Sequence, residues 1–433
     1  MPTEIVFPSR STKGIGWDDI TPRLGVAYDL FGNGKTAVKF NLGKYVESYV
    51  SGNGNDLDLG PLARIAVTTT RGWTDLNKDF VPQCDLTVFA ANGECGPYAN
   101  QLGQNTFTRT FDPAWSTGWS NRPYNWEMGV SVQQELFPRV SVNGGYFRRT
   151  FGNWYMTDNR ATTLSDYTPF SIQAPSDPRL PGGGGQVVSG LYNLVPAKVG
   201  QVDELSQHSS NFAPQTEYWH GVDLGVVARL RNGLTVQGGV STGRKIADNC
   251  AIRAVLPEMG SNGTTANSDS AAQITVSPAT PTNPYCRVEE PFLTGVRGLA
   301  TYTIPRVDVQ VSGTLQSNPG PELAANYVAS NAVIAGGPQP LGRPLSGGAA
   351  NVTVNLVAPG TLYGDRVNQI DFRVAKILRF GRTRTQLSLD LYNATNTDKP
   401  LTYNPAFVPG GSWLTPTSIM TARFIKLGVQ FDF

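Results

Sequence analysis

The sequence predicts an all-β fold, an antiparallel transmembrane β-barrel built from consecutive hairpins. Its segments alternate apolar side chains with polar or small ones, which is the period of a strand with one apolar face. Five turns of two to four residues alternate with five connections of roughly 25 to 75 residues. Short turns on one side and long loops on the other are typical of barrels that cross a membrane.

The composition excludes several other classes of protein. Charged residues make up only 16% of the 433 residues, while Gly numbers 47 and aromatic residues reach 10%. No run of 18 apolar residues occurs, which excludes a helical membrane protein. The net charge is +2 and the basic residues are dispersed, so we expect no nucleic-acid partner.

Five hairpins follow one another along the chain, and their apolar residues alternate with polar ones. The first pairs residues 23–31 with 36–45 across a turn in which Asn33-Gly34 supplies positive φ angles. The other pairs are 126–136 with 140–146, 221–230 with 234–241, 292–304 with 307–315, and 370–376 with 386–392. The apolar phase slips near Ala375 and Lys376, where we expect a bulge or the membrane edge.

A final strand over residues 421–433 completes the set. Its apolar residues alternate with polar or small ones up to the aromatic carboxyl terminus, and they are Ile425, Leu427, Val429, Phe431 and Phe433. The count is therefore 5 × 2 + 1 = 11 strands. Bacterial barrels have an even number of strands, so we expect half of a 22-stranded barrel, completed by a missing N-terminal half or a second chain. A weak twelfth strand over residues 4–7 is the alternative.

The expected extracellular loops lie at about 46–123, 157–214, 246–291, 317–365 and 393–418. The cysteines fall in two of these loops as two sequence-local pairs, Cys84 with Cys95 and Cys250 with Cys286. In an oxidising compartment they would form two loop-closing disulfides. Four unrelated free thiols are the alternative.

Several segments resemble the C-terminal barrel of a TonB-dependent outer-membrane receptor, and most of all the Oar-like receptors. They are Trp17 to Lys35, Pro123 to Leu136, Gly145 to Trp154, Arg379 to Arg384 and the terminal strand. The resemblance covers nearly the whole of residues 1–433, and it implies energised uptake of a solute through the bacterial outer membrane. No signal peptide, TonB box or plug is visible in the sequence.

The resemblance also implies partners. They are outer-membrane lipid, the TonB system acting through a plug that this sequence lacks, and the barrel-assembly machinery. That machinery would read the terminal Phe433, with Phe431 and Val429 before it. Two alternatives stay open: a non-energised porin or structural, adhesive barrel, and a soluble secreted β-rich enzyme or lectin.

One segment has the spacing of a calcium loop. Asp75, Asn77 and Asp79 stand at positions 1, 3 and 5, and hard oxygen ligands at alternate positions can wrap one Ca²⁺. The pattern departs at position 6, where Phe80 replaces Gly, and at position 12, where Asp85 would have to substitute one residue early. An acidic turn closed by a disulfide is the alternative.

Nothing in the sequence has the spacing of a catalytic site. The two histidines, His208 and His220, lack the partners of a Ser/His/Asp or metal site. We therefore expect no enzyme. Contacts with a transported solute would come from loop aromatic residues, and the candidates are Trp154, Tyr155 and Trp219.

Overall fold

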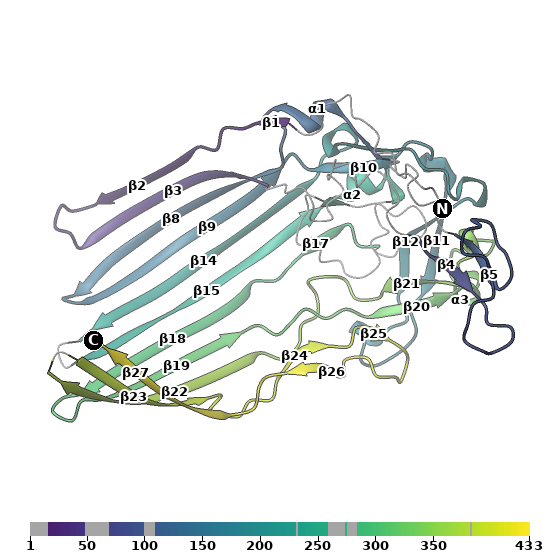
Figure 1. The fold of residues 1–433 in the computed structure, drawn as a ribbon. Helices are drawn as coiled ribbons and strands as arrows, with labels where there is room; N and C mark the ends of the chain where they lie inside the picture. The colour runs from purple at the N-terminus through teal and green to yellow at the C-terminus, as the bar shows by residue number, and fades with distance from the viewer. Residues whose placement is uncertain are drawn as a thin grey trace.

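The computed structural model describes residues 16–47, 69–98, 109–230, 233–258, 273–274, 284–381 and 383–433. Its main feature is an antiparallel sheet in which eleven strands pair in the order of the chain, with a short strand beside one of them (Figure 1). The possible strand over residues 4–7 lies outside the described residues. Among those described, no helix is both long and apolar enough to cross a membrane.

The strands of the main sheet are long and mostly regular. In order they are β2 (Arg23–Asp29), β3 (Thr36–Val46), β8 (Tyr124–Phe137), β9 (Val140–Gly152), β14 (Thr216–Arg229), β15 (Leu234–Asp248), β18 (Leu293–Ile304), β19 (Val309–Asn318), β22 (Val367–Phe380), β23 (Thr383–Tyr392) and β27 (Phe424–Asp432). The short β17 (Arg287–Glu289) pairs with the end of β15. The all-β antiparallel prediction and the five hairpins are confirmed.

The turns differ in detail from the prediction. In the first turn Gly32 and Gly34 take positive φ, whereas Asn33 does not. Asp29 closes that turn by accepting a hydrogen bond from the Gly34 amide at 2.6 Å. In the fourth hairpin the second strand begins at Val309 because Asp308 takes a positive φ of 49° and stays in the turn.

The bulge predicted near Ala375 and Lys376 is wrong. The register of β22 with both neighbours runs through these residues without a shift. The apolar phase changes there because Ala375 and Ile377 are buried on the opposite face from Val374. A register shift occurs instead at the end of β8, between Glu135 and Phe137.

The two faces of the sheet differ in polarity. Residues that share one face by register include Val130, Val222, Leu224, Leu315, Phe372, Leu389, Leu427 and Val429. Within this apolar face Leu224 is 64% exposed and Leu427 is 77% exposed. The opposite, polar face carries Asp223, Gln237, Ser241 and Lys426 among many glycines. Among the residues that the structure describes, none therefore forms a core over the apolar face of the sheet.

The long connections form smaller sheets of their own. They contain β4 (Arg71–Trp73), β5 (Cys95–Tyr98), β6 (Arg109–Phe111), β7 (Thr117–Trp119), β10 (Tyr155–Asn159), β11 (Tyr167–Gln173), β12 (Val187–Leu194), β13 (Glu204–His208), β16 (Gln273–Ile274), β20 (Asn326–Ser330), β21 (Asn351–Asn355), β24 (Pro400–Tyr403), β25 (Ala406–Phe407) and β26 (Pro416–Ile419). The short β1 (Gly16–Asp18) precedes the main sheet and pairs with β7. The α-helices are α1 (Pro113–Ser116), α2 (Cys250–Arg253) and α3 (Asn331–Ala335). Single 3₁₀ turns cover Leu164–Asp166, Pro181–Gly183, Pro196–Lys198, Ser209–Asn211 and Ser346–Gly348.

Three connections, between β9 and β14, β19 and β22, and β23 and β27, share one hydrophobic core. We call this assembly the loop unit. Phe170 and Leu191 come from the first connection, Val354 from the second, and Phe407 and Trp413 from the third. All five are nearly inaccessible to solvent. The connections lie at one end of the sheet, and the short turns and the carboxyl terminus lie at the other (Figure 1).

Candidate functional site

The polar face of the sheet holds a cavity of about 490 Å³ lined by residues from β3, β8, β9, β14 and β15. Arg149 forms an ion pair with Glu127 across β9 and β8. Lys245 lies 3.0 Å from the buried carboxylate of Glu217 across β15 and β14. The rings of Phe147 and Trp219 also line this cavity. It is the candidate site because it combines a few polar groups with aromatic surface.

The end of the apolar face nearest the long connections carries basic and aromatic side chains. The Arg148 guanidinium lies 4.7 Å from the centre of the Tyr218 ring, and that of Arg244 lies 5.2 Å from the Phe292 ring. Arg244 also donates a hydrogen bond to His220 at 3.1 Å. Amphipathic rings of this kind gather where a membrane meets water.

Two arginine side chains, Arg179 and Arg343, join the connections of the loop unit. Arg179 forms an ion pair of 2.7 Å with Asp177, and its guanidinium also donates to the carbonyl oxygen of Gly411, on another connection. The hydrogen bonds from Arg179 hold the pKa of Asp177 well below its usual range. A second arginine, Arg343, donates to the side chain of Asn193 at 2.6 Å. These contacts join connections that are far apart in the sequence.

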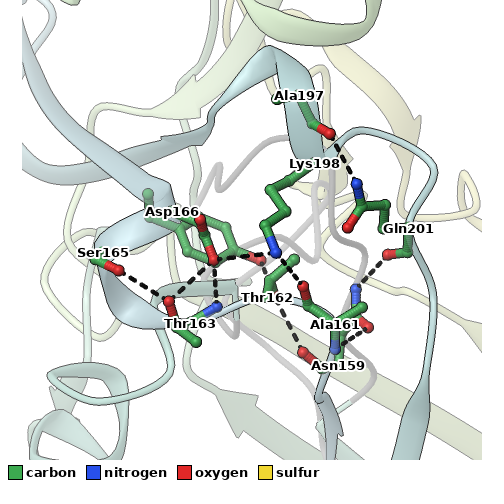
Figure 2. A network of polar contacts seen from close by, with 10 residues as sticks. Asn159, Ala161, Thr162, Thr163, Ser165, Asp166, Ala197, Lys198 and Gln201 are labelled. Atoms are coloured by element: carbon green, nitrogen blue, oxygen red, sulfur yellow. Dashed lines mark hydrogen bonds and ion pairs between the residues drawn. The ribbon is translucent and has the colours of Figure 1, made fainter.

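Figure 2 shows a polar network at one edge of the loop unit. Lys198 donates to the carbonyl oxygen of Ala161 at 2.8 Å and lies 3.8 Å from Asp166. The amide of Thr163 donates to Asp166, and this hydrogen bond lowers the pKa of that carboxyl. Asn159 donates to the carbonyl oxygen of Gln201 at 2.8 Å. These contacts join the end of β10 and the segment that follows it to the segment that follows β12.

Both cysteine pairs are disulfides with the sequence-local pairing. Cys84 is bonded to Cys95, and Cys250 is bonded to Cys286. The first lies between β3 and β8, and the second between β15 and β18. Both therefore close long connections.

The calcium-loop residues are turned toward their own backbone. Asp75 accepts hydrogen bonds from the amides of Lys78 and Phe80, at 2.6 and 3.0 Å. Phe80 has a φ of 60°, so it adopts the left-handed conformation that the pattern assigns to Gly. Asp79 accepts from Val81, and that hydrogen bond lowers the pKa of Asp79.

Asp85, the substitute ligand, accepts from Thr87 instead. Glu94, which the sequence pattern did not include, lies against this segment and accepts from the Leu76 amide at 2.8 Å. Within the described residues no three His, Cys, Asp or Glu side chains are placed to hold a metal ion. Calcium binding by Asp75, Asn77 and Asp79 stays a prediction.

The three aromatic candidates for solute contact lie in different surroundings. Tyr155 is only 4% exposed, with its ring centre 4.4 Å from that of Trp115, so it belongs to a small core and presents no surface to a solute. Trp154 is half-buried and begins the connection after β9. Trp219 lines the cavity of the polar face. The sequence pattern did not indicate Phe147. Its place in the cavity depends on the register of β9 with the neighbouring strands.

The terminal strand β27 pairs with β23 along its length, and its other edge pairs with no described strand. The side chains of Val429, Phe431 and Phe433 are all exposed. The strand β2 forms the other edge of the sheet. Recognition of the terminal residues by an assembly machinery stays a prediction.

No known family model matches this chain, and no curated protein does. Among solved structures the chain is similar to the outer membrane transporter YddB from Escherichia coli, at a TM-score of 0.43 and 11% sequence identity. The match covers 94% of this chain and 40% of that one, so this chain spans less than half of that protein. A likeness at this level assigns no function, and the proposals below rest on the geometry of this chain.

Proposed function

We propose that this chain is the C-terminal barrel portion of a TonB-dependent receptor that takes up a solute through the bacterial outer membrane. The observation that carries the proposal is the apolar face of the sheet, where large side chains such as Leu224 on β14 and Leu427 on β27 stand exposed. Surfaces of this kind bind another protein or a membrane. Short turns at one end and long connections at the other favour the membrane.

The free energy of burying the apolar face supports the same proposal. Burying apolar surface stabilises by about 25 cal/mol per Å², so a face that stays in water gives up this stabilisation on every strand. Hydrocarbon would supply it. The edges of β2 and β27, which pair with no described strand on their outer sides, cannot stay open in lipid, because each lost backbone hydrogen bond costs several kcal/mol there. The proposal therefore includes further strands, from a missing N-terminal barrel half or a second chain.

TonB dependence rests on the sequence resemblance alone, so it needs its own test. The protein produced from its native gene is isolated from the outer-membrane fraction and mixed with the purified periplasmic domain of TonB. We expect co-purification of the two proteins, and we expect proteoliposomes of the receptor not to swell in isotonic L-arabinose, because a plug closes the lumen.

Two outcomes would replace this proposal. Swelling in arabinose without TonB binding would indicate the non-energised porin. Outer-membrane insertion with neither property would indicate a structural or adhesive barrel. Recovery of the protein in the aqueous phase after detergent partitioning would overturn the membrane assignment itself.

A further inference from the structure

We propose that the cavity on the polar face is a subsite for a neutral saccharide, which stacks on the rings of Phe147 and Trp219. The inference rests on the proposed transport function and names the class of solute. Neither ring is in the loop unit: Phe147 belongs to β9 and Trp219 to β14, in the rigid part of the sheet.

Four glycines allow both rings to lie flat against the sheet. A Cβ atom on Gly145 would come within 2.8 Å of the Phe147 ring, and one on Gly129 within 2.9 Å. On the neighbouring strands, a Cβ on Gly221 would come within 2.7 Å of the Trp219 ring, and one on Gly243 would also collide with it. The rings therefore occupy the space that side chains would fill.

The register places the two rings on adjacent strands, β9 and β14. Phe147 is paired directly with Gly221, the residue beneath the indole of Trp219. Both rings line the same cavity. The Phe147 ring covers glycines of β8 and β9, and the Trp219 ring covers glycines of β14 and β15, so the aromatic lining extends over four strands, in contrast to a cage closed around a point.

The charges at the rim are paired, which disfavours a strongly charged ligand. Arg149 neutralises Glu127, and Lys245 neutralises Glu217. Asp223 also lines the cavity, and no hydrogen bond or ion pair of its side chain occurs within the described residues. With Arg148, the lining offers three carboxylate acceptors, Glu127, Glu217 and Asp223, and three cationic donors, Arg148, Arg149 and Lys245, so it carries no net charge.

A saccharide fits this combination. One face of a pyranose ring presents C–H groups, whose partial positive charge is attracted to the negative face of an aromatic ring. The hydroxyl groups at the ring edge can pair with carboxylates and with guanidinium or ammonium groups, and such charge-assisted hydrogen bonds are the stronger ones. A small organic cation would use the rings and Asp223, but it would leave most of this flat surface uncovered.

The test measures binding to the full-length protein in detergent by calorimetry. The probes are maltohexaose and cellohexaose, with polygalacturonate and choline as the charged competitors. We expect one neutral hexasaccharide to bind, and Trp219→Leu and Phe147→Leu each to raise its Kd at least about tenfold. Trp219→Phe, which keeps a flat ring, should stay within about threefold. Trp119→Leu, at a tryptophan that is 66% exposed at the end of β7, is the matched control and should change nothing.

Several results would overturn the inference. They are the absence of binding of either neutral hexasaccharide to the unaltered protein, tighter binding of choline or polygalacturonate, or unchanged binding by both leucine variants. Heat-modifiable migration shows whether each variant is folded, and the unaltered protein decides the question if both variants misfold. If TonB binding persists while the saccharides fail, the solute class is wrong and the proposed function stands.

Discussion

The main sheet and the loop unit treat their apolar side chains in opposite ways. Phe170 and Trp413, in the loop unit, are buried against residues from other connections, as in a water-soluble domain. Leu224 and Leu427, in the sheet, are largely exposed. The loop unit has a hydrophobic core of its own. The apolar side chains of the sheet would be buried only if another molecule or a membrane covered them. The difference suggests that one chain folds against two solvents.

The largest effect is expected in the loop unit. Phe170→Ala should destabilise it by about 3–5 kcal/mol because the substitution leaves a cavity in a packed core. Proteinase K added to whole cells should then cut the connections, while the sheet keeps its heat-modifiable migration. The control is Val328→Ala in the same unit, whose side chain is 53% exposed. Loss of the sheet together with the loops would show that the two regions are not separate.

The next largest effect is expected at Leu224, where a substitution should destabilise the sheet although the side chain is exposed. Leu224→Arg should destabilise the sheet by about 2–4 kcal/mol if this position faces hydrocarbon. In water an exposed leucine would tolerate the change. Urea unfolding in lipid vesicles measures the loss, and Gln237→Arg, on the polar face of the next strand, is the control. Equal stability of the two variants would contradict a lipid-facing surface.

We expect the stability of the connections, and not that of the main sheet, to depend on pH. Glu258 is 3% exposed, and burial raises its pKa to about 7, with a smaller contribution from the charge of Asp158. Because the folded pKa is raised, the protonated carboxyl stabilises below pH 4.5, and this stabilisation, at most about 3 kcal/mol, is lost as the pH rises through 7.

Protease cutting near Glu258 should therefore increase between pH 5 and 8. Other titratable groups nearby are Tyr167, whose pKa burial raises to about 12, and Arg253, whose pKa burial lowers to about 10. Neither changes its charge within this range. Glu258→Gln should remove the dependence. If protease cutting of that variant still increased with pH, another group would cause the dependence, and Asp158 would be the first candidate.

The smallest effect concerns a surface ion pair. Lys399 lies 2.7 Å from Asp365, and both side chains are exposed. Lys399→Met should leave the protease sensitivity of the connections unchanged, because solvent and salt screen an exposed pair. A clear increase in cutting would mean that this pair fastens two connections, as Arg179 does.

The sheet could be predicted from the sequence because each of its strands is amphipathic on its own. The alternation of Val222 and Leu224 with Asp223 gives the strand and its faces without knowledge of any neighbour. The turn at Asp308 and the continuous register at Ala375 could not be predicted, since backbone conformation and pairing decided them.

The loop unit could not be predicted for a different reason. The core around Phe170 and Phe407 joins segments that are far apart in the chain and lack a regular period. The residues of the candidate site also divide into those that the sequence indicates and those that only the structure shows. Trp219 could be named from the sequence, but Phe147 and the glycines beneath both rings gain their meaning only from the register of four strands.

The central claim is that one face of the sheet lies in lipid, and site-directed spin labelling tests it most directly. All four native cysteines are in disulfides, so single cysteines at positions 222 to 228 of β14 can be labelled without background. In lipid vesicles we expect oxygen accessibility to be high at positions 222, 224 and 226, and accessibility to a water-soluble nickel chelate to be high at 223 and 225. High accessibility to the nickel chelate at 222, 224 and 226 would place the apolar face in water and contradict the account.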